Sequence, residues 1–331
     1  MVSKNNEIKK DYPDDSAGNL MIKSVPTILE SKKIKDIIYL LENGSSHFES
    51  IDYVYVLDKK NVLKGVLSIK GIFSKDKDEL IKNQLAEKLV CVDEYTDQEE
   101  IALLALKQNL KAIPVVDSTQ RFLGIINHNT LLRILDTEAV EDVLNFGGVS
   151  YKGTVDDVMT LSTFTSIKHR LPWLIIGLLG GLIIAGVIGS FEEVLSQNII
   201  LASFIPVLVY MSDAIGTQMQ AFVIRDLSTH KELNFLEYLF KQSLVILFIG
   251  FVVSLLLYIF SLFLHQNPTI SLVLGASLFF GSASSLLSGL IVPYTFSKFD
   301  IDPANVSGPI ATTLQDLFSV LIYFLVATAL L

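Results

Sequence analysis

The second half of this 331-residue chain contains five long apolar runs, and they constrain its fold more than any other feature. An α-helix needs about 20 apolar residues to cross the hydrocarbon core of a bilayer. In lipid the backbone must satisfy its own hydrogen bonds, so runs of this length favour helices. The sequence therefore predicts an α-helical membrane domain with five transmembrane helices, over Leu171–Phe191, Ile199–Ile224, Leu244–Leu264, Ile270–Pro293 and Val306–Leu331.

The last run carries a carboxylate, Asp316, at membrane depth. A charge there costs about 2.5–3.5 kcal/mol on insertion scales, so it usually faces the protein interior or an aqueous pathway. Thr312, Ser319 and Tyr323 recur with Asp316 at helical spacing, which places all four on one face. The alternative is a structural ion pair, but the basic residues of this half all lie at the ends of the runs. We therefore predict a functional role for Asp316.

The second run carries another carboxylate, Asp213, with Thr217 and Gln220 at helical spacing. For this residue a structural pairing near a helix break stays open as an alternative. Carboxylate, carbonyl and water oxygens suit Mg²⁺, Ca²⁺ and Mn²⁺, whereas softer metals favour thiolate or imidazole. This half has no cysteine, and its histidines lie at the edges of the runs. The pattern predicts passage of a hard divalent cation. The predicted pore ligands are Asp316, Asp213, Thr312 and Thr313.

The basic residues of the second half indicate its orientation. When the five runs are threaded as antiparallel helices, all of these residues fall on one side, which the positive-inside rule makes cytoplasmic. They are Lys168, Arg170, Arg225, Lys231, Lys241 and Lys298. We therefore expect the soluble first half inside the cell and the C-terminus outside. Residues 1–16 contain no apolar core of a signal peptide, so none is expected.

Charge and cysteine content exclude some classes of partner and site. The chain has a net charge of −9 and no strongly basic patch, which argues against nucleic acid as a partner. The single cysteine, Cys91, excludes a disulfide within the chain and cannot form a zinc site unaided. Its apolar neighbours predict a buried position in a strand.

The first half contains an internal repeat with an offset of 59 residues, as from Val54 to Ile113. The matching strands are Val54–Asp58 with Ile113–Asp117, and Leu63–Leu67 with Phe122–Ile126. A helical stretch precedes each pair, at Ile34–Asn43 and Gln98–Asn109, and an amphipathic helix follows each, from Ile69 and from His128. Self-similarity of this kind indicates duplicated units that bury each other's apolar faces. The pattern resembles a pair of CBS domains, which in many proteins bind adenosine nucleotides or sense ions. A duplicated α/β domain used only for dimer contacts is the alternative.

An acidic helical face follows the second repeat. Glu138, Glu141 and Asp142 lie at positions i, i+3 and i+4, so they project from one side of a helix. Three carboxylates repel one another unless a cation or a basic partner neutralises them, although spacing alone equally fits a solvated face. Residues 143–169 then lead into the first apolar run as a connecting helix.

Three motifs resemble the MgtE family of magnesium channels or transporters over nearly the whole chain. They are the Tyr-Pro-Asp-Asp-Ser-Ala-Gly-Asn-Leu-Met segment of Tyr12–Met21, the Arg-Leu-Pro-Trp-Leu segment of Arg170–Leu174, and the segment from Asp302 to Asp316. The resemblance implies a homodimer with five transmembrane helices per subunit, a connecting plug helix, and a pore in which Asp316 holds hydrated Mg²⁺. It also implies that Mg²⁺ bound between the CBS and plug elements closes the pore. Glu138, Glu141 and Asp142 match the family's sensor cluster.

The chain departs from the family pattern at four places. We expect the acidic helical domain that usually precedes the Tyr-Pro motif to be missing, because only about ten residues precede that motif here. The second-helix motif, typically Gly-Asn-x-Gly-x-Gln, reads Asp213-Ala214-Ile215-Gly216-Thr217-Gln218, so an amide is lost and a carboxylate gained. Gly308 stands where some members carry Asn. The acidic start of the last CBS helix reads Asn129-Thr130-Leu131-Leu132-Arg133. These differences lead us to expect weakened or rewired gating by Mg²⁺.

Together these features predict a multidomain protein, an α/β tandem CBS pair followed by an α-helical membrane domain. The expected divisions are a short N-terminal segment (1–20), the CBS pair (21–142, as 21–83 and 84–142), the plug helix (143–169) and the pore domain (170–331). We expect a Mg²⁺ channel or transporter in the cell membrane, not an enzyme, with the bilayer, divalent cations and a second copy as partners. Mg²⁺ would be both transported and regulatory, and the CBS pair would take an adenine nucleotide. The alternatives are transport of Mn²⁺ or Co²⁺, a cation-coupled carrier, or a CBS-controlled membrane sensor without transport.

Overall fold

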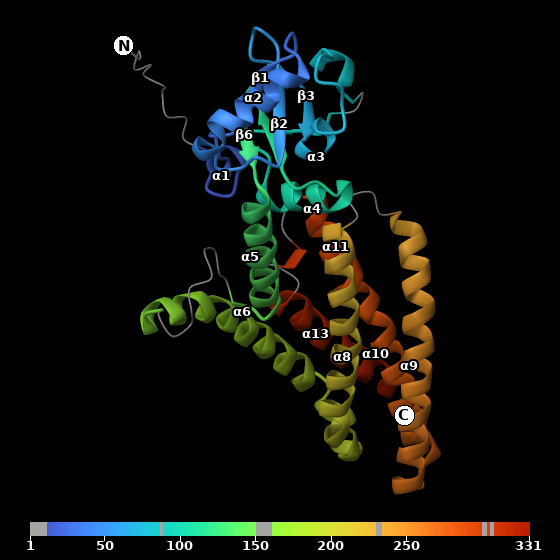
Figure 1. Cartoon of the computed structure of the whole chain (residues 1–331). Helices are drawn as coiled ribbons and strands as arrows, with labels where there is room; N and C mark the ends of the chain where they lie inside the picture. The colour runs from blue at the N-terminus through green and yellow to red at the C-terminus, as the bar shows by residue number, and fades with distance from the viewer. Residues whose placement is uncertain (1–11, 87–88, 150–160, 230–233, 300–302, 305–307) are drawn as a thin grey trace. The chain divides into compact units, whose positions relative to one another are not determined.

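A computed structural model describes residues 12–86, 89–149, 161–229, 234–299, 303–304 and 308–331. The chain forms two compact units, Met1–Glu138 and Ala139–Leu331 (Figure 1). The first holds the strands and short helices, and the second holds the long helices. This division agrees with the predicted fold class.

The first unit contains the predicted repeat as two small sheets. Each has three strands in the same order, with the first strand parallel and the third antiparallel to the central one. The strands are β1 Thr27–Leu29, β2 Tyr53–Leu57 and β3 Leu63–Ser68, then β4 Val92–Asp93, β5 Ile113–Val116 and β6 Phe122–Ile126. The strand register also shifts at equivalent places in the two sheets, between Val56 and Leu57 in the first and between Val115 and Val116 in the second. The duplication inferred from the sequence is confirmed.

Helices flank the strands where the sequence predicts them. They are α1 Ala17–Leu20, α2 Ile34–Gly44, α3 Ile69–Ile72, α4 Gln98–Gln108 and α5 His128–Phe146, with 3₁₀ turns η1 Ser45–His47 and η2 Ile81–Gln84. α4 starts at an N-cap, where the Asp97 side chain accepts from the Glu99 amide, and ends at Asn109 in a left-handed conformation (φ 52°). α5 runs unbroken across the division expected at residue 142, and residues 150–160 of the expected connecting helix lie outside the described residues.

The two repeats bury each other's apolar faces. One cluster of buried residues combines Tyr55 and Leu63 of the first sheet with Val116 and Phe122 of the second. The Tyr55 and Phe122 rings stack with centroids 5.1 Å apart. The strand-connecting turns also exchange backbone bonds, because the Leu63 amide donates to Gln120 (3.1 Å) and the Phe122 amide to Asn61 (2.9 Å). The pairing is therefore built into both the core and the turns.

Each repeat closes its strand-connecting turn on an aspartate. The Asp58 Oδ1 atom accepts from the amides of Lys60 (2.7 Å) and Val62 (3.0 Å). One repeat later, Asp117 Oδ1 accepts from the amides of Thr119 (2.8 Å) and Arg121 (2.9 Å). The Val62 amide is the main cause of the lowered pKa of Asp58. At Asp117 burial acts to raise the pKa of the carboxyl. The hydrogen bonds from Thr119 and Arg121 outweigh this effect, so the pKa is lowered.

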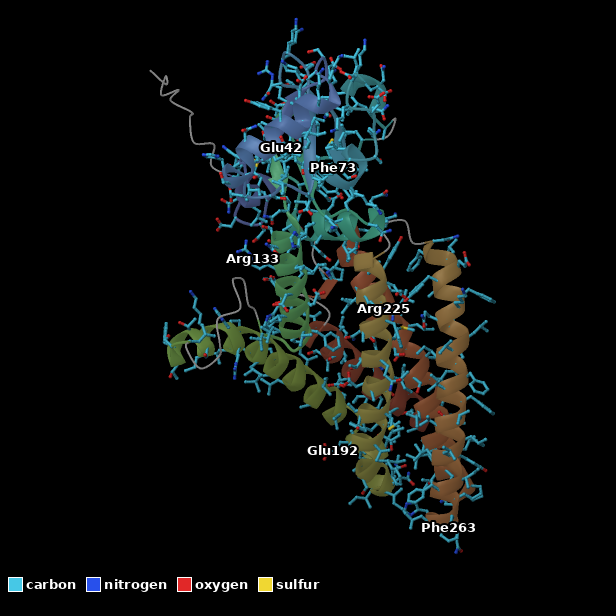
Figure 2. All side chains as sticks on the ribbon, viewed as in Figure 1. Glu42, Phe73, Arg133, Glu192, Arg225 and Phe263 are labelled. Atoms are coloured by element: carbon cyan, nitrogen blue, oxygen red, sulfur yellow. The ribbon has the colours of Figure 1, made fainter. Side chains whose placement is uncertain are left out.

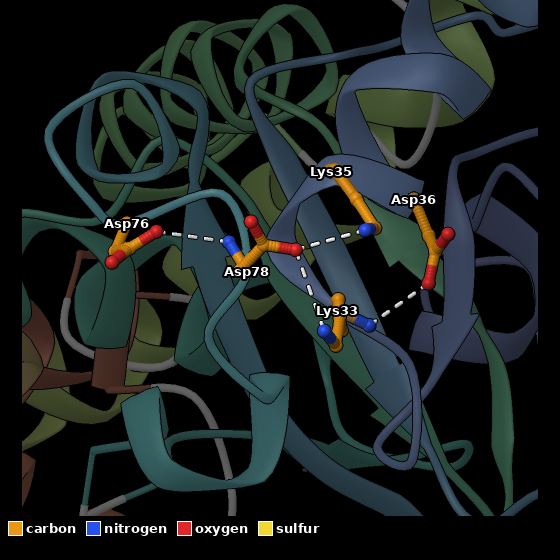
Figure 3. Close-up of polar contacts among 5 residues, drawn as sticks. All are labelled: Lys33, Lys35, Asp36, Asp76 and Asp78. Atoms are coloured by element: carbon orange, nitrogen blue, oxygen red, sulfur yellow. Dashed lines mark hydrogen bonds and ion pairs between the residues drawn. The ribbon is translucent and has the colours of Figure 1, made fainter.

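A lysine–aspartate network fixes the start of α2 (Figure 3). The Asp78 carboxylate accepts from the ammonium groups of Lys35 (2.8 Å) and Lys33 (3.4 Å), while the Lys33 amide donates to Asp36 (2.9 Å). Lys35, more than Lys33, holds the pKa of the Asp78 carboxyl below its usual range. Because these groups are exposed, the network orients the loop more than it stabilises the fold.

Cys91 is only half-buried and lies immediately before β4, so the prediction of a buried strand residue is wrong. The strand it was expected to join has two residues and begins at Val92. Partial burial still raises the pKa of the Cys91 thiol.

The second unit consists of long helices. They are α6 Thr163–Gly189, α7 Glu192–Gln197, α8 Ile200–Thr229, α9 Phe235–His265, α10 Pro268–Leu286, α11 Val292–Lys298 and α13 Pro309–Leu330. A π-helical segment, η3 Leu287–Ile291, joins α10 and α11 into one continuous span. Within the described part of the chain, five helices are long and apolar enough to cross a membrane, as predicted. α6 begins at Thr163, ahead of the predicted start at Leu171.

α10 occupies the centre of the second unit. It packs against α8, α9 and α13, and in Figure 1 it lies between α8 and α9. Most of its span is buried, whereas few residues of α6 are. α9 exposes large apolar side chains such as Phe263, which points away from the helices (Figure 2). This outer surface has the character of a lipid-facing one.

The two aspartate turns generate a pH prediction. Because the pKa of each folded carboxyl lies below the unfolded value of about 3.9, their stabilisation is complete above that pH and is lost as the pH falls through the folded pKa. We expect hydrogen-exchange protection of the Val62 and Arg121 amides to fall below about pH 4. Asp58→Ala and Asp117→Ala should lack that protection at pH 7, while Glu42→Ala, an exposed carboxylate on α2, should retain it. Unchanged protection in both turn variants would contradict this role.

Candidate functional site

Asp316 lies on α13, two turns from the start of the helix, and is half-buried. α13 packs against α6, α8 and α10. The Asp316 carboxylate has no hydrogen-bond or ion-pair partner among the residues that the structure describes, and no basic side chain neutralises it there. The predicted alternative of a structural ion pair therefore finds no support in the described part of the chain.

Asp213 lies on the neighbouring helix α8 and is also half-buried. Its Oδ1 atom is enclosed and accepts no hydrogen bond from the described residues. α8 and α13 pack against each other, and Gly216, one turn along α8 from Asp213, lies beside Gln315, the residue before Asp316. Two ionised groups in such a setting repel each other and lose hydration, and both costs fall when a cation lies between them. The arrangement thus has the chemistry of a cation site.

The two threonines predicted as ligands differ in their surroundings. Thr312 lies one turn before Asp316 on the same face and is half-buried. The hydroxyl of Thr313 donates to the Pro309 carbonyl (2.7 Å), and its methyl group packs against Gly180 of α6. Thr312 therefore stands nearer to the face that Asp316 presents, while Thr313 is engaged with α6 and its own helix.

Two other polar residues expected on that face serve the interior of the helix bundle. The Ser319 hydroxyl is buried and donates to the Gln315 carbonyl (2.7 Å). The Tyr323 hydroxyl is buried and donates to the Leu201 carbonyl at the start of α8 (2.8 Å). Both hydroxyls are buried in the bundle, where Ser319 bonds within α13 and Tyr323 bonds to α8, so neither lies on a face open to an ion.

Gln315 is the polar residue that sequence reasoning missed. Its side chain is fully buried, and it bonds with Ser288, Gly281, Ser284 and Ser319. The signal available in the sequence was an amide inside an apolar run, beside a carboxylate. A buried amide in lipid requires partners from neighbouring helices, and the sequence does not show which helices supply them.

The predicted regulatory carboxylates lie along α5. Glu138 accepts a hydrogen bond from the Gln98 side chain, and Glu141 accepts one from Asn145 (3.5 Å). Asp142 follows on the same helix. Among the described residues, no group of three or more His, Cys, Asp or Glu side chains is placed to hold a metal ion. These three residues therefore do not form a metal site by themselves in one subunit.

The end of α5 packs closely on the start of α13. A β-carbon on Gly308 would lie 2.4 Å from the Phe146 carbonyl oxygen, closer than any real contact. Gly148 (φ +74°) lies against the Pro309 ring. This approach explains why a side chain as large as Asn is absent at position 308.

Comparison with known proteins agrees with this architecture. Residues 205–326 match the family model MgtE, described as a divalent cation transporter, and residues 17–78 and 83–137 each match the CBS domain. The magnesium transporter MgtE of Bacillus subtilis is 34% identical over 330 residues, which span 99% of this chain and 72% of the relative. The chain belongs to the MgtE family.

A second curated relative and a solved structure also match this chain. The magnesium transporter MgtE of Enterococcus faecalis is 32% identical over 96% of this chain and 69% of its own length. The crystal structure of the soluble part of a magnesium transporter is 33% identical over 39% of this chain and 50% of that chain, with a TM-score of 0.38. This membership confirms the resemblance predicted from the sequence. The chain is a multi-pass membrane protein that transports divalent cations. It is a transporter rather than an enzyme.

The close approach at Gly308 generates a stability prediction. Gly308→Ala should force the chain to shift at Phe146 and lower the free energy of unfolding by about 1–3 kcal/mol, as overpacking usually does. Gly181→Ala on α6 is the matched control, because nothing lies within 4 Å of its β-carbon position. Thermal unfolding of both variants in the same detergent measures the difference. A Gly308→Ala protein as stable as Gly181→Ala would show that the approach is looser than described.

Proposed function

We propose that this chain conducts Mg²⁺ across the cell membrane and that Asp316 holds the ion in the pathway. The observation that carries the proposal is the pair of carboxylates on α8 and α13, which have no counter-charge among the described residues. Mg²⁺ loses its waters reluctantly and is usually bound through one or two carboxylates with several waters retained. A pair of half-buried carboxylates suits such an ion. The names of the curated relatives, magnesium transporters, support the same ion.

Asp213 would contribute the second negative charge, with Thr312 as a further oxygen ligand. Thr313, whose hydroxyl donates to the Pro309 carbonyl, would join only through the remaining lone pair of its oxygen. Among the described residues, a single subunit supplies two carboxylates to this site. In a homodimer whose copies meet along the exposed side of Asp316, both pairs would surround one pathway. We therefore propose a homodimer with the ion path between the subunits.

The distribution of charge supports a cytoplasmic position for the CBS pair. Lys168 and Arg170 lie near the start of α6, Arg225 near the end of α8, and Lys298 at the end of α11. In Figure 2 Arg225 and Glu192 lie toward opposite ends of α8. Under the positive-inside rule the basic ends face the cytoplasm, and the C-terminus faces outward.

We propose that the CBS pair regulates transport by binding Mg²⁺ and an adenine nucleotide. Glu138, Glu141 and Asp142 would bind regulatory Mg²⁺ only together with groups from another element or subunit. A solved structure of the cytosolic domain of the Mg²⁺ channel MgtE in complex with ATP is 33% identical over 37% of this chain and 49% of that chain (TM-score 0.36). The nucleotide proposal depends on the CBS assignment itself.

A second candidate keeps transport and changes the ion. Asp213 replaces an amide with a carboxylate beside the main ligand, which strengthens the field at the site. A stronger field of this kind suits Mn²⁺ or Co²⁺ as well as Mg²⁺, and it also suits a cation-coupled carrier.

The role of Asp316 is tested by removing its carboxylate. Asp316→Ala should abolish Mg²⁺ uptake into proteoliposomes, because the pathway loses its main ion ligand. Glu192→Ala, which removes an exposed carboxylate from α7, is the matched control and should transport normally. Near-normal uptake by Asp316→Ala would refute the assignment.

Selectivity tests the contribution of Asp213. Asp213→Asn should reduce the preference for divalent over monovalent cations by about tenfold, the effect of roughly 1.4 kcal/mol of lost attraction. Competition of Mg²⁺ uptake by Mn²⁺, Ca²⁺ and Na⁺, in wild type and variant, measures the change. An unchanged ranking in Asp213→Asn would remove this residue from the site.

Gating by cytosolic Mg²⁺ should be weak. Arg133 projects from α5 as an exposed cation where the family carries acidic residues (Figure 2), and a cation there repels regulatory Mg²⁺. Patch recordings with cytosolic Mg²⁺ stepped through the millimolar range should show little closure, and Arg133→Asp should increase it. Strong closure of the wild-type protein would contradict this prediction.

A further inference from the structure

Gln315 is fully buried and uses both ends of its amide. Its Oε1 atom accepts a hydrogen bond from the Ser288 hydroxyl. Its Nε2 group donates to the Gly281 carbonyl (3.1 Å) and reaches the hydroxyls of Ser319 (3.0 Å) and Ser284 (3.3 Å). An amide satisfied in this way resists any change in the position of its helix, because each displaced bond leaves a buried polar atom unpaired.

Three of the four partners of Gln315 come from one face of the fourth span. Gly281 and Ser284 lie on α10, and Ser288 lies one turn further along, in the π-helical segment η3. Segments of π-helix inside α-helices are frequent at functional sites. Gln315 therefore links α13 to the point where α10 passes from α-helix into the π-helical segment η3.

Helix α8 meets the same junction through Gly216. A β-carbon on Gly216 would lie 3.6 Å from the Gln315 side chain and 3.5 Å from that of Ser285. A β-carbon on Gly289 would lie 2.8 Å from the Gly216 carbonyl oxygen, so only glycine allows this approach. Three helices are thus held at one level by close backbone contact and by the buried amide.

This junction adjoins both carboxylates of the proposed ion site. Asp316 follows Gln315 directly, and Asp213 lies one helical turn before Gly216. A rotation of α13 about its axis moves the Gln315 amide out of its hydrogen bonds and turns Asp316, the next residue, by the same angle. The geometry that satisfies the amide is therefore also the geometry that directs the carboxylate.

We infer that Gln315 is a positioning residue for ion transport, which fixes the rotation and depth of α13 so that Asp316 faces Asp213. The inference rests on the proposed role of Asp316 as ion ligand. Gln315 itself does not touch the ion, because its side chain points into the bundle and all its polar atoms are engaged.

Removal of the amide should release the helix without unfolding the bundle. The hydroxyls of Ser284 and Ser319 also donate to backbone carbonyls, of Gly281 (2.7 Å) and Gln315 (2.7 Å). Ser288 has a weaker second acceptor in the Ser285 carbonyl (3.5 Å). Gln315→Leu therefore keeps the volume of the side chain and leaves its former partners with other acceptors.

A thiol at position 316 reports the position of that side chain without relying on transport. In a Cys91→Ser background, which removes the native thiol, Asp316→Cys is labelled with a charged methanethiosulfonate reagent in liposomes. Adding Gln315→Leu should change the labelling rate by about tenfold, since misplacement by an ångström produces effects of at least this size. Tyr323→Phe, which removes another buried hydrogen bond of α13, should leave the rate unchanged.

Transport kinetics provide the second readout. With Asp316 intact, Gln315→Leu should raise the apparent KM for Mg²⁺ about tenfold, an effect of roughly 1.4 kcal/mol. Tyr323→Phe should retain the wild-type KM. Should Gln315→Leu fail to fold, Ser288→Ala removes the bond to Oε1 alone and should change the labelling rate and KM in the same direction.

The outcomes separate this inference from the proposed function. A wild-type labelling rate and KM in folded Gln315→Leu or Ser288→Ala, with Asp316→Ala inactive, would overturn the positioning role alone. Normal uptake by Asp316→Ala, or no labelling of the Asp316→Cys thiol when Gln315 is present, would overturn the ion pathway itself.

Discussion

The structure of the second unit depends on one constraint: a polar group inside a bilayer must find its partner within the protein. Tyr323 meets it with a backbone carbonyl of α8, and Gln315 meets it with four groups of neighbouring residues. Asp213 and Asp316 do not meet it within the described part of the chain, and neither do smaller groups such as the Ser212 hydroxyl and the Gln220 amide nitrogen. Carboxylates left without a protein partner at this depth are costly, which supports the proposal that they bind an ion or water.

Two adjacent residues of α13 therefore have different surroundings. Successive positions on a helix differ by about 100° in direction, so Gln315 faces the central span while Asp316 faces elsewhere. The buried Gln315 amide holds α13 against its neighbours through hydrogen bonds, and the Asp316 carboxylate supplies a negative charge. Small residues at the crossing, Gly216 and Gly289, allow the backbones to approach closely enough for this arrangement.

The first unit is organised by duplication, and its sequence reveals this directly. Strands, preceding helices and the two aspartate turns recur in order because each repeat must bury its apolar face against the other. The membrane spans are equally visible, since their length follows from bilayer thickness. The ends of helices are harder to predict from the sequence. α6 begins before its apolar run, and α5 continues across the domain boundary expected at residue 142. Helix ends depend on capping and packing, which hydropathy does not record.

The sequence by itself determined the class of each half, the number of spans, the repeat, and the two carboxylates that no membrane helix carries without cause. These properties follow from local composition and spacing. Only the tertiary structure decided which polar residues serve the interior and which remain open. Ser319 and Tyr323 share a helical face with Asp316 by spacing, yet their hydroxyls bond inside the bundle. The role of Gln315 and the close contact at Gly308 also arise from neighbours distant in sequence, because packing between helices depends on shape that no single segment encodes.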